Sequence, residues 1–356
     1  MNLPFKHPPK HLCILRLSAI GDVCHTLPIV RTIQKYWPET QLTWIIGKTE
    51  HALVNDIENI HFIVFDKSNK FQSYKSIYKH LKKQQFDALL HMQMSLRSSL
   101  ISLLVKSKIK LGFDKKRAKD AQWLFSNNKI PYQPKQHVVD SFFGFTKTLG
   151  IDKQEYQWNI PNRYSQQELQ DSLSITKIDF NKPFIIISPC SSMAYRNWLP
   201  ESYAAVADKI QQQYKIPILL SGGTSSIEYH MGKEIENIVQ YPVINLIGQT
   251  DLKQLLSLLK FSYCVISPDS GPAHIATAVN TPVIGLYACT NPERARPYCS
   301  AQWTVNRYPE AIQRKLNCSV DDVNWGTRVR DDWAMKLITI DDVVTKFEQL
   351  FVANPV

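Results

Sequence analysis

Short apolar runs alternate with longer amphipathic stretches in the first half of the chain. Apolar runs typical of buried strands cover residues 11–17, 41–46, 61–65 and 88–92. Helical spacing of apolar positions follows the loop 18–22 as far as residue 36, and recurs over 72–84, 96–105 and 140–149. Pro28 interrupts the first of these helices, so we expect a kink or a restart there. Strands that alternate with helices indicate a parallel sheet with helices on both faces.

The same alternation begins again after a polar segment over 151–182. Strand-like runs cover 184–188, 217–221, 243–246, 263–267 and 283–287, and helical spacing covers 201–214, a stretch from 272 and 340–351. Two such α/β units predict a ligand cleft at the carboxyl ends of their sheets. We expect an N-terminal domain over 1–165, a linker over 166–182, a C-terminal domain over 183–338 and a terminal helix over 339–356.

The composition is that of a two-domain protein without a membrane span. The chain has 356 residues, of which 44% are hydrophobic, and two domains of about 150–200 residues each suit that length. The first apolar run is short and Arg16 interrupts it. No run approaches the roughly 18 apolar residues of a transmembrane helix, so we expect a cytoplasmic protein without a signal peptide. The seven cysteines form no CxxC pair, which favours reduced, mostly buried thiols and argues against a metal site.

The net positive charge is confined to the N-terminal half. Residues 1–165 hold 25 Lys or Arg and 12 acidic residues, whereas residues 166–356 hold 17 and 19. The stretches 67–83 and 106–119 concentrate the excess. Solvated helix faces explain part of it, and a surface for a polyanion or an anionic membrane is the more specific interpretation. The chain has no zinc-finger spacing, RRM-type motif or helix-turn-helix pattern, so nucleic acid is not the expected partner.

Residues 267–276, Ser-Pro-Asp-Ser-Gly-Pro-Ala-His-Ile-Ala, carry the most specific local signal. They follow an apolar strand, and Asp269, Ser270 and Gly271 are cap and turn residues ahead of Pro272, which suits a first helical position. A strand that ends in such a turn exposes helix N–H groups at the carboxyl edge of a sheet, an arrangement that binds phosphates. We therefore expect a site for a phosphorylated ligand in the second half.

Turns after two other predicted strands carry polar groups. Gly21 permits a tight turn, and Asp22 lies at the sheet edge either as a helix N-cap or as a general base. Ser191, Ser192 and Arg196 follow the first strand of the second half. They offer hydroxyl donors and a guanidinium that neutralises a phosphate, unless they form an ordinary loop.

A Gly-Gly turn at 222–223 ends a later strand, and Glu228 follows it. By itself this is a plain turn followed by a solvated helix residue. Its position after a strand of the same sheet as the other turns makes the set more specific than any one of them.

Together the motifs resemble glycosyltransferase family 9, the bacterial ADP-heptose:lipopolysaccharide heptosyltransferases. The matching segments are Ser-x-x-Gly-Asp-x-x-His-Thr-Leu-Pro at 18–28, Ser-Ser…Arg-Asn-Trp-x-Pro at 191–200, Gly-Gly at 222–223, Asp-Ser-Gly-Pro-Ala-His at 269–274 and Thr-Pro-Val-Ile-Gly-Leu at 281–286. They span nearly the whole chain in order. The resemblance implies a GT-B fold, in which two Rossmann-like domains face a central cleft, with the acceptor on the first and the nucleotide sugar on the second.

The resemblance also implies roles in the donor reaction. Asp22 corresponds to the catalytic base of an inverting transfer of heptose from ADP-heptose. The donor-binding set would be Ser191, Ser192, Arg196, Glu228, Asp269, Ser270, Gly271 and His274. Arg196 stands where the family usually has lysine, Asp269 would bind heptose hydroxyls, and Glu228 would hold the ribose. Diphosphate charge would be met by Arg196 and backbone N–H groups, so no metal or other cofactor is expected.

On the acceptor side, the corresponding residues are Ser18, Gly21, Gln93, Arg97, Arg117 and His137. The implied acceptor is the Kdo/heptose inner core of lipopolysaccharide on lipid A. Its anionic character accounts for a basic N-terminal half, and contact with the inner face of the inner membrane is expected. The alternatives are an enzyme of this fold with another nucleotide sugar or a later core acceptor, and a non-catalytic polyanion-binding protein.

Overall fold

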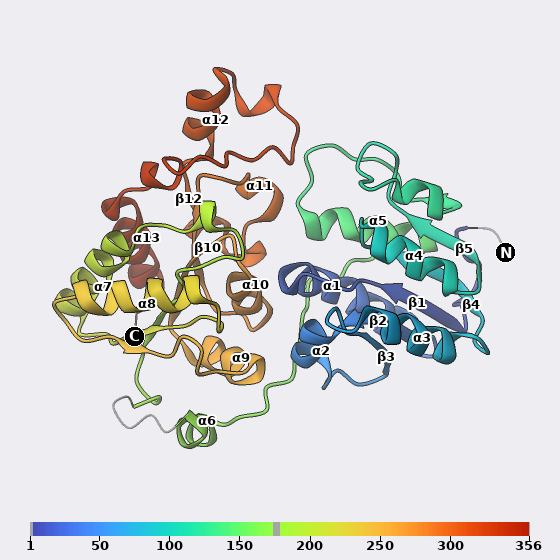
Figure 1. The fold of residues 1–356 in the computed structure, drawn as a ribbon, viewed down its shortest axis with the longest axis horizontal. Coiled ribbons are helices and arrows are strands. Elements are labelled where there is room, and N and C mark those ends of the chain that lie inside the picture. Colours follow the sequence, from blue (N-terminus) through green and yellow to red (C-terminus); the bar gives the residue numbers. More distant parts are fainter. Residues whose placement is uncertain (1–2, 174–178, 356) are drawn as a thin grey trace. The chain divides into compact units, whose positions relative to one another are not determined.

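The computed structural model describes residues 3–173 and 179–355, which form two compact units that divide between Pro161 and Asn162 (Figure 1). Each unit contains one parallel sheet of six strands. Helix α6 (Gln166–Leu173) lies in the segment expected to be a linker and belongs to the C-terminal unit. Residues 174–178 of that segment lie outside the described residues.

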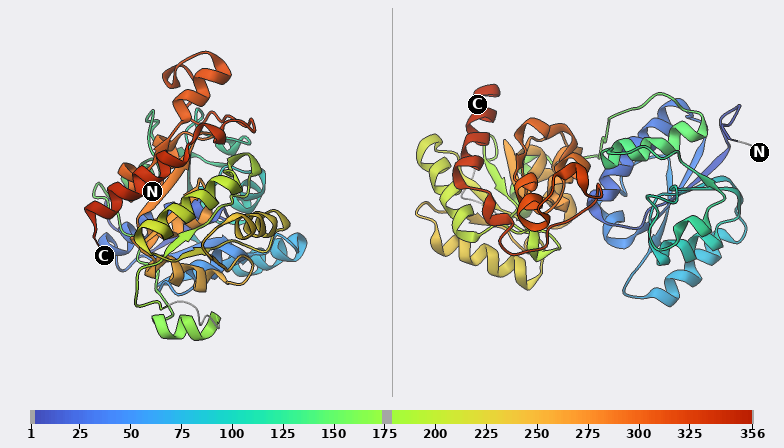
Figure 2. Two further views of the ribbon diagram at one scale, coloured as in Figure 1. Left: turned by 90° about the vertical axis from the view of Figure 1, so that its left-hand side faces the viewer. Right: turned by 90° about the horizontal axis from the view of Figure 1, so that it is seen from above.

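In the N-terminal unit the strand order is β3-β2-β1-β4-β5-β6. The strands are β1 (His11–Leu15), β2 (Gln41–Gly47), β3 (Ile60–Phe65), β4 (Phe86–His91), β5 (Ser107–Gly112) and β6 (Asn128–Lys129). The helices are α1 (Ile20–Tyr36), α2 (Lys48–Val54), α3 (Lys70–Leu81), α4 (Leu96–Leu104), the 3-10 turn η1 (Gln122–Phe125) and α5 (Val138–Leu149). Helices α1 and α5 pack against each other, as do α3 and α4 (Figure 2). The predicted strands and helices are confirmed with ends shifted by at most three residues, whereas α2, β5, η1 and β6 were not predicted.

Helix α1 continues through Pro28, so the helix does not restart there, and the alternative of a kink stays a prediction. Proline removes one N–H donor from the helix. The residues on either side, Leu27 and Ile29, are fully buried, and the packing of α1 against α5 offsets the lost hydrogen bond. The Thr32 hydroxyl also donates to the Pro28 carbonyl, at 2.8 Å.

In the C-terminal unit the strand order is β12-β11-β10-β7-β8-β9. The strands are β7 (Ile185–Ile187), β8 (Ile218–Leu220), β9 (Ile244–Asn245), β10 (Cys264–Pro268), β11 (Val283–Tyr287) and β12 (Val305–Asn306). The α-helices are α7 (Pro200–Tyr214), α8 (Ser226–Ile238), α9 (Leu252–Phe261), α10 (Gly271–Ala278), α11 (Pro292–Ala295), α12 (Tyr308–Leu316) and α13 (Ile340–Ala353). The 3-10 turns are η2 (Ala194–Arg196), η3 (Tyr298–Trp303), η4 (Val320–Asp322) and η5 (Met335–Leu337). Strand β10 pairs with β7 and β11, which places the loops after β7 and β10 at one sheet edge.

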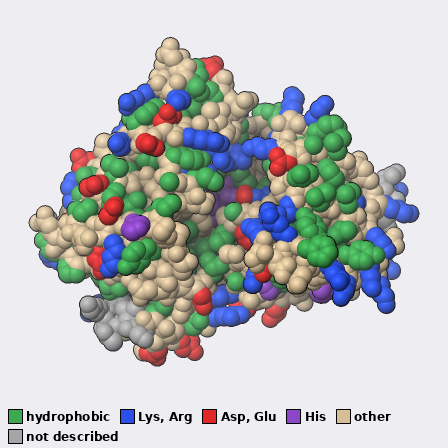
Figure 3. Space-filling view, in the orientation of Figure 1, with side chains coloured by type: hydrophobic (Ala, Val, Ile, Leu, Met, Phe, Trp, Pro, Cys, Tyr) green, Lys and Arg blue, Asp and Glu red, His purple; other side chains and the backbone are tan. Residues whose placement is uncertain are grey.

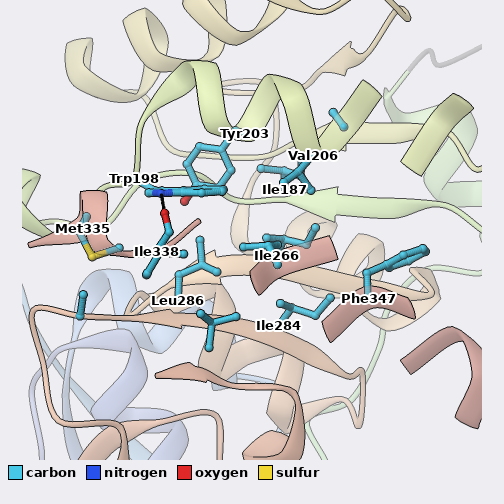
Figure 4. Packing of buried hydrophobic residues seen from close by; sticks show 14 of the residues in the cluster. Ile187, Trp198, Tyr203, Val206, Ile266, Ile284, Leu286, Met335, Ile338 and Phe347 are labelled. Carbon is cyan, nitrogen blue, oxygen red and sulfur yellow. Dashed lines mark hydrogen bonds between the residues drawn. The ribbon is translucent and has the colours of Figure 1, made fainter. Parts of the chain in front are cut away.

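The core of the C-terminal unit anchors the loop after β7. Trp198, at the end of that loop, is 1% exposed and packs edge-to-face on Tyr203, with ring centroids 5.2 Å apart (Figure 4). Its indole Nε1 donates to the Ile338 carbonyl at 3.2 Å, close to the start of α13. Burial of a large aromatic ring stabilises a fold strongly, so this contact fixes where the loop ends.

Candidate active site

In the N-terminal unit, the turn after β1 holds a buried arginine against a carboxylate. Arg16 is 6% exposed, and its Nη1 donates to the Met92 carbonyl at 2.6 Å, just beyond the end of β4. The other terminal nitrogen, Nη2, forms an ion pair with Oδ2 of Asp22. The guanidinium carbon lies 5.5 Å from the centroid of the Phe142 ring in α5. The arginine is therefore held on three sides, and it orients the carboxylate.

The helix that carries Asp22 begins earlier than predicted. It starts at Ile20, so Gly21 lies in its first turn and the predicted loop ends at Ala19. Asp22 is the third residue of the helix instead of its N-cap, and its Oδ2 also accepts the Ala19 N–H at 3.4 Å. Within the described parts of the chain nothing hydrogen-bonds to Oδ1, and the Asp22 side chain is 39% exposed. One carboxylate oxygen thus remains available to accept a proton.

Gln93 joins the end of β4 to the same turn. Its Oε1 accepts the N–H of Leu17 at 2.6 Å and that of Ser18 at 3.3 Å. Its Nε2 donates to the Ser18 hydroxyl at 3.3 Å. The structure therefore brings Ser18, Gln93 and Asp22 together. Gln93 fixes the turn through its hydrogen bonds to Leu17 and Ser18.

The remaining predicted acceptor residues have contacts within the fold. Arg97 lies in the first turn of α4 with its guanidinium carbon 5.9 Å from the Phe65 ring centroid. Arg117 pairs with Asp114 and donates to the Ser141 hydroxyl at 2.8 Å. His137 is the N-cap of α5, 5% exposed, and its Nδ1 accepts the Val139 N–H at 3.2 Å. Arg117 and His137 thus both stabilise the start of α5, and their contact with an acceptor stays a prediction.

In the C-terminal unit, Arg196 and Asp269 form an ion pair across the edge of the sheet. Nη1 of Arg196 lies 3.1 Å from Oδ2 of Asp269 and also donates to the Asp269 carbonyl, at 3.2 Å. Nε2 of His274 lies 3.7 Å from Oδ1 of the same carboxylate. The two side chains of the ion pair are only 14% and 13% exposed. The sequence resemblance assigned these residues to separate parts of the donor, and the structure places them in one cluster.

Electrostatics in this cluster favour a charged pair. Burial alone raises the pKa of Asp269, but hydrogen bonding to His274 and the charge of Arg196 outweigh it, and the pKa lies below its ordinary value. Burial alone lowers the pKa of Arg196, but the charge of Asp269, together with Tyr195 and Tyr287, outweighs it, and the pKa lies above its ordinary value. The site therefore holds a cation whose charge is already partly balanced, beside the first turn of α10.

The loop that carries Arg196 is shaped by Asn197. Its Oδ1 accepts the Ser191 N–H at 2.8 Å, which closes the loop between those residues. The Ser191 hydroxyl donates to the Met193 carbonyl at 3.3 Å, and Ser192 is exposed. Sequence inspection singled out the serines, whereas Asn197 is the residue that sets their position.

The start of α10 has helix N–H groups that no side chain caps. Ser270 is the N-cap residue, but its hydroxyl is hydrogen-bonded to the Ser267 hydroxyl at 2.7 Å and makes no cap bond. Gly271 is the first helical residue and Pro272 the second, whereas Pro272 was predicted at the first helical position. Uncapped N–H groups at a helix N-terminus attract anions, which agrees with the predicted phosphate site.

Glu228 is held by the turn that precedes its own helix, α8. Its Oε1 accepts the Gly223 N–H at 2.8 Å, and its Oε2 accepts the Ser225 hydroxyl at 2.6 Å. A Cβ on Gly223 would lie 3.1 Å from Oε2, a tight contact that a larger residue could make only if the carboxylate shifted slightly. Burial, and then the charge of Glu228, raise the pKa of Cys190 to about 12, which places this carboxylate near the loop after β7. Glu228 thus borders the same sheet edge as Arg196.

Sequence inspection missed Arg16 as a site residue. The signal was a charged side chain inside an otherwise apolar strand run, which requires a partner when buried.

All seven cysteines are free thiols and five are buried, as predicted. In residues 3–173 and 179–355, no group of three or more His, Cys, Asp or Glu side chains is arranged so that it could bind a metal ion. None of the helices there has the length and apolar character needed to cross a bilayer.

Comparison with known sequences identifies the family. The model of glycosyltransferase family 9 (heptosyltransferase) matches residues 74–323. The lipopolysaccharide core heptosyltransferase OpsX of Haemophilus influenzae is 41% identical over 348 residues, which cover 97% of this chain and 98% of that protein. Lipopolysaccharide heptosyltransferase 3 of Escherichia coli is 22% identical, over 93% and 96% of the two chains.

Solved structures share the fold. A glycosyl transferase family 9 protein from Veillonella parvula has a TM-score of 0.80 and 19% identity, covering 97% of this chain and 98% of its own. Escherichia coli heptosyltransferase WaaC with ADP has a TM-score of 0.70 and 18% identity, over 96% and 99% of the two chains. The predicted α/β architecture of GT-B type is confirmed. This chain is therefore a glycosyltransferase with the GT-B fold, and it belongs to glycosyltransferase family 9, the heptosyltransferases.

Proposed function

We propose that the enzyme transfers L-glycero-D-manno-heptose from ADP-heptose to the Kdo/heptose inner core of lipopolysaccharide, with inversion at the anomeric carbon. The observation that carries the proposal is the Asp22 carboxylate, oriented by Arg16 through Oδ2 while Oδ1 is left for a proton. The relative with 41% identity is named a lipopolysaccharide core heptosyltransferase. A solved structure with the same fold is described with ADP, which supports an ADP-linked donor.

The proposed reaction is a single displacement. Asp22 takes the proton of the acceptor hydroxyl as that oxygen bonds to the anomeric carbon, and the bond from that carbon to the diphosphate breaks on the opposite face. Arg196, Ser191, Ser192 and the N–H groups of Ser270 and Gly271 would stabilise the negative charge on departing ADP. Asp269 would bind the sugar hydroxyls, His274 the phosphates, and Glu228 the ribose. Since Asp269 already pairs with Arg196, the donor would exchange part of that pair for its own contacts.

On the acceptor side, Ser18, Gly21, Gln93, Arg97, Arg117 and His137 would contact the anionic sugars. Residues 1–165 carry 25 basic and 12 acidic residues, which suits such an acceptor. Because lipid A is anchored in a membrane, the enzyme would work in the cytoplasm at the inner face of the inner membrane. The proposal requires no metal, because the groups named above carry the charge compensation.

A transfer assay tests the proposal. Purified enzyme is given defined Kdo-lipid A acceptors, with and without phosphate on Kdo, and ADP-heptose is compared with other nucleotide sugars. Transfer from ADP-heptose with inverted configuration at the new bond is the expected result. Transfer confined to another nucleotide sugar or to a later core acceptor would overturn the assignment of substrate. Tight binding of duplex DNA at physiological salt, unchanged by Asp22→Asn and without transfer, would favour a polyanion-binding protein.

A further inference from the structure

Helix α4 buries mostly serines and exposes leucines. Its buried residues are Ser98, Ser99, Ile101 and Ser102, and of these only Ile101 is apolar. The outward side consists of leucines, Leu96, Leu100 and Leu103, which are 58%, 44% and 60% exposed. The hydrophobic effect within a single folded chain favours the opposite arrangement. The outward leucines therefore call for an apolar environment outside the chain.

Helix α3 extends the same apolar face. Phe71 is 81% exposed and Tyr78, two turns later on the same side of the helix, is 54% exposed. A shallow hollow between the two helices is lined by apolar and aromatic side chains and one lysine, namely Phe71, Tyr74, Lys75, Tyr78, Leu100 and Leu104. Figure 3 shows hydrophobic side chains gathered on the α4 side of the N-terminal unit, with Lys and Arg side chains along the border. Exposed patches of this kind mark interaction surfaces.

Lysines surround this face, and acidic residues are nearly absent from the segment that builds it. Between residues 67 and 113 the chain holds ten Lys or Arg and one acidic residue, Asp87. The Asp87 carboxylate accepts the His11 N–H at 2.9 Å. The exposed lysines on and after the two helices include Lys70, Lys75, Lys79, Lys82, Lys83 and Lys106. Aromatic and leucine side chains framed by lysine are typical of helices that lie in the headgroup region of an anionic bilayer.

We propose that the α3–α4 face is a membrane-docking surface, which inserts Phe71, Leu100 and Leu103 among anionic phospholipids while its lysines contact the phosphates. The inference deepens the proposed function, since a lipid-anchored acceptor requires the enzyme to reach a bilayer. A second copy of the chain suits this face less well. A two-fold contact would bring the lysines of both copies together, at a cost in electrostatic repulsion. Arg97, proposed above to contact the acceptor, lies at the start of α4 on the same element.

Vesicle binding tests the surface without relying on transfer. The probe is a vesicle of phosphatidylethanolamine and phosphatidylglycerol that contains no acceptor. The variant Phe71→Ser/Leu100→Ser/Leu103→Ser should bind at least about tenfold more weakly than wild type. Leu316→Ser/Val352→Ser is the matched control, because it replaces apolar side chains that are equally accessible, 47% and 81% exposed, on α12 and α13. That control should bind like wild type.

A second pair of variants tests the charge. Lys75→Gln/Lys79→Gln should weaken binding by about fivefold per lysine, and only to vesicles that contain phosphatidylglycerol. Vesicle affinity equal to wild type in the apolar triple variant would overturn the proposal. So would a wild-type dimer in solution that the triple variant abolishes while vesicle binding is retained, since a second copy would then cover the face.

Failure of this surface is distinguishable from failure of the proposed function. With a deacylated, water-soluble acceptor the triple variant should transfer heptose at the wild-type rate, because its substitutions lie outside the proposed reacting groups. With an acceptor embedded in vesicles its rate should fall along with vesicle affinity. Vesicle binding without transfer in the wild type would overturn the proposed function and leave the docking surface standing.

Discussion

Arg16 is paired with Asp22 through Nη2, while Nη1 of the same buried guanidinium donates to the carbonyl of Met92. The two ends of the guanidinium thus connect the carboxylate on α1 to the end of β4, the neighbour of β1 in the sheet. A lysine has a single nitrogen and cannot make both contacts in this geometry. Arg16 is therefore a positioning residue for the proposed base.

Replacing the carboxylate should stop transfer without affecting the donor site. We expect Asp22→Asn to lower kcat by about 10²–10⁴-fold, the usual contribution of a general base. Donor affinity should stay unchanged, because the proposed donor residues lie in the C-terminal unit. Steady-state kinetics and calorimetric titration with the nucleotide sugar measure the two effects. Near wild-type turnover in the variant would mean that another group removes the proton.

Arg16→Lys should keep the charge and lose the orientation. A misplacement of the base by about 1 Å costs up to about 10²-fold in rate, so we expect kcat to fall while KM for the acceptor changes little. Arg31, whose Nε donates to the Trp158 carbonyl at 3.1 Å, supplies a control on the same helix as Asp22. Arg31→Lys should leave kcat unaffected. Equal losses in the two variants would show a general effect of weakened packing instead of a role at Asp22.

The Arg196–Asp269 pair predicts an unusual pattern in donor binding. We expect Arg196→Ala to weaken binding of the nucleotide sugar by about 10–100-fold, the range for hydrogen bonds to charged groups. Part of that loss would come from Asp269, a buried anion left near the diphosphate without its arginine partner. Asp269→Asn introduced into the Arg196→Ala variant should therefore recover some affinity for ADP, even though it removes a proposed sugar ligand. Comparing the affinity for ADP with the affinity for the full nucleotide sugar separates the recovery at the diphosphate from the loss of the sugar contact.

A lysine at position 196 tests the geometry of this pair. The resemblance to the family places lysine at this position, so Arg196→Lys should retain donor binding within about tenfold of wild type, as a point charge rather than a planar fork. An ADP affinity that is the same in the alanine, lysine and wild-type enzymes would remove Arg196 from the diphosphate site.

Most strands and helices were predictable because the burial of apolar side chains determines where they form. Strand β11 was predicted with its observed bounds, Val283–Tyr287, since it is a continuous apolar run. Strand β5 was missed because Lys108 and Lys110 alternate with buried Ile109 and Leu111, and the lysines were assigned to a basic surface stretch. A half-buried strand with lysine on one side has few local signals of its own.

The site was predictable as a set of turns but not as a set of contacts. Turn residues mark where strands end, and parallel topology places those ends at one edge. Which side chains then meet depends on tertiary packing. Arg117 and His137 form hydrogen bonds with the first turn of α5, and Arg196 forms an ion pair with Asp269. Asn197 and Arg16 were not identified as supports because their partners are far away in the sequence or on the backbone.

Trp198 predicts a link between folding and donor binding. We expect Trp198→Ala to destabilise the C-terminal unit by about 3–5 kcal/mol, since it removes a buried indole. Trp198→Phe should cost about 1–2 kcal/mol, mainly from the lost hydrogen bond to Ile338. Because the loop with Arg196 ends at this residue, donor affinity should fall in the phenylalanine variant as well. Urea unfolding and ADP titration measure both.

Trp333 is the matched control for this substitution. It is half-buried and its ring lies 4.2 Å from the guanidinium carbon of Arg314. Trp333→Phe should reduce stability less than Trp198→Phe and leave ADP affinity unchanged. Loss of ADP affinity in both variants would attribute the effect to global stability and not to the loop.

His91 makes the N-terminal unit sensitive to acid. It is fully buried at the end of β4, and burial, together with the charge of Lys110, lowers its pKa from 6.5 to about 3. Between these values the unfolded chain binds a proton that the folded chain does not, so stability is lost as the pH falls below about 6.5. From pH 6.5 to pH 5 this amounts to about 2 kcal/mol. His91→Gln cannot titrate and should flatten the dependence of stability on pH, measured by hydrogen exchange of the β4 and β5 amides.

His80, exposed on α3, is the matched control. His80→Gln should leave the slope as in wild type, and an equally steep slope in His91→Gln would assign the acid sensitivity to another group.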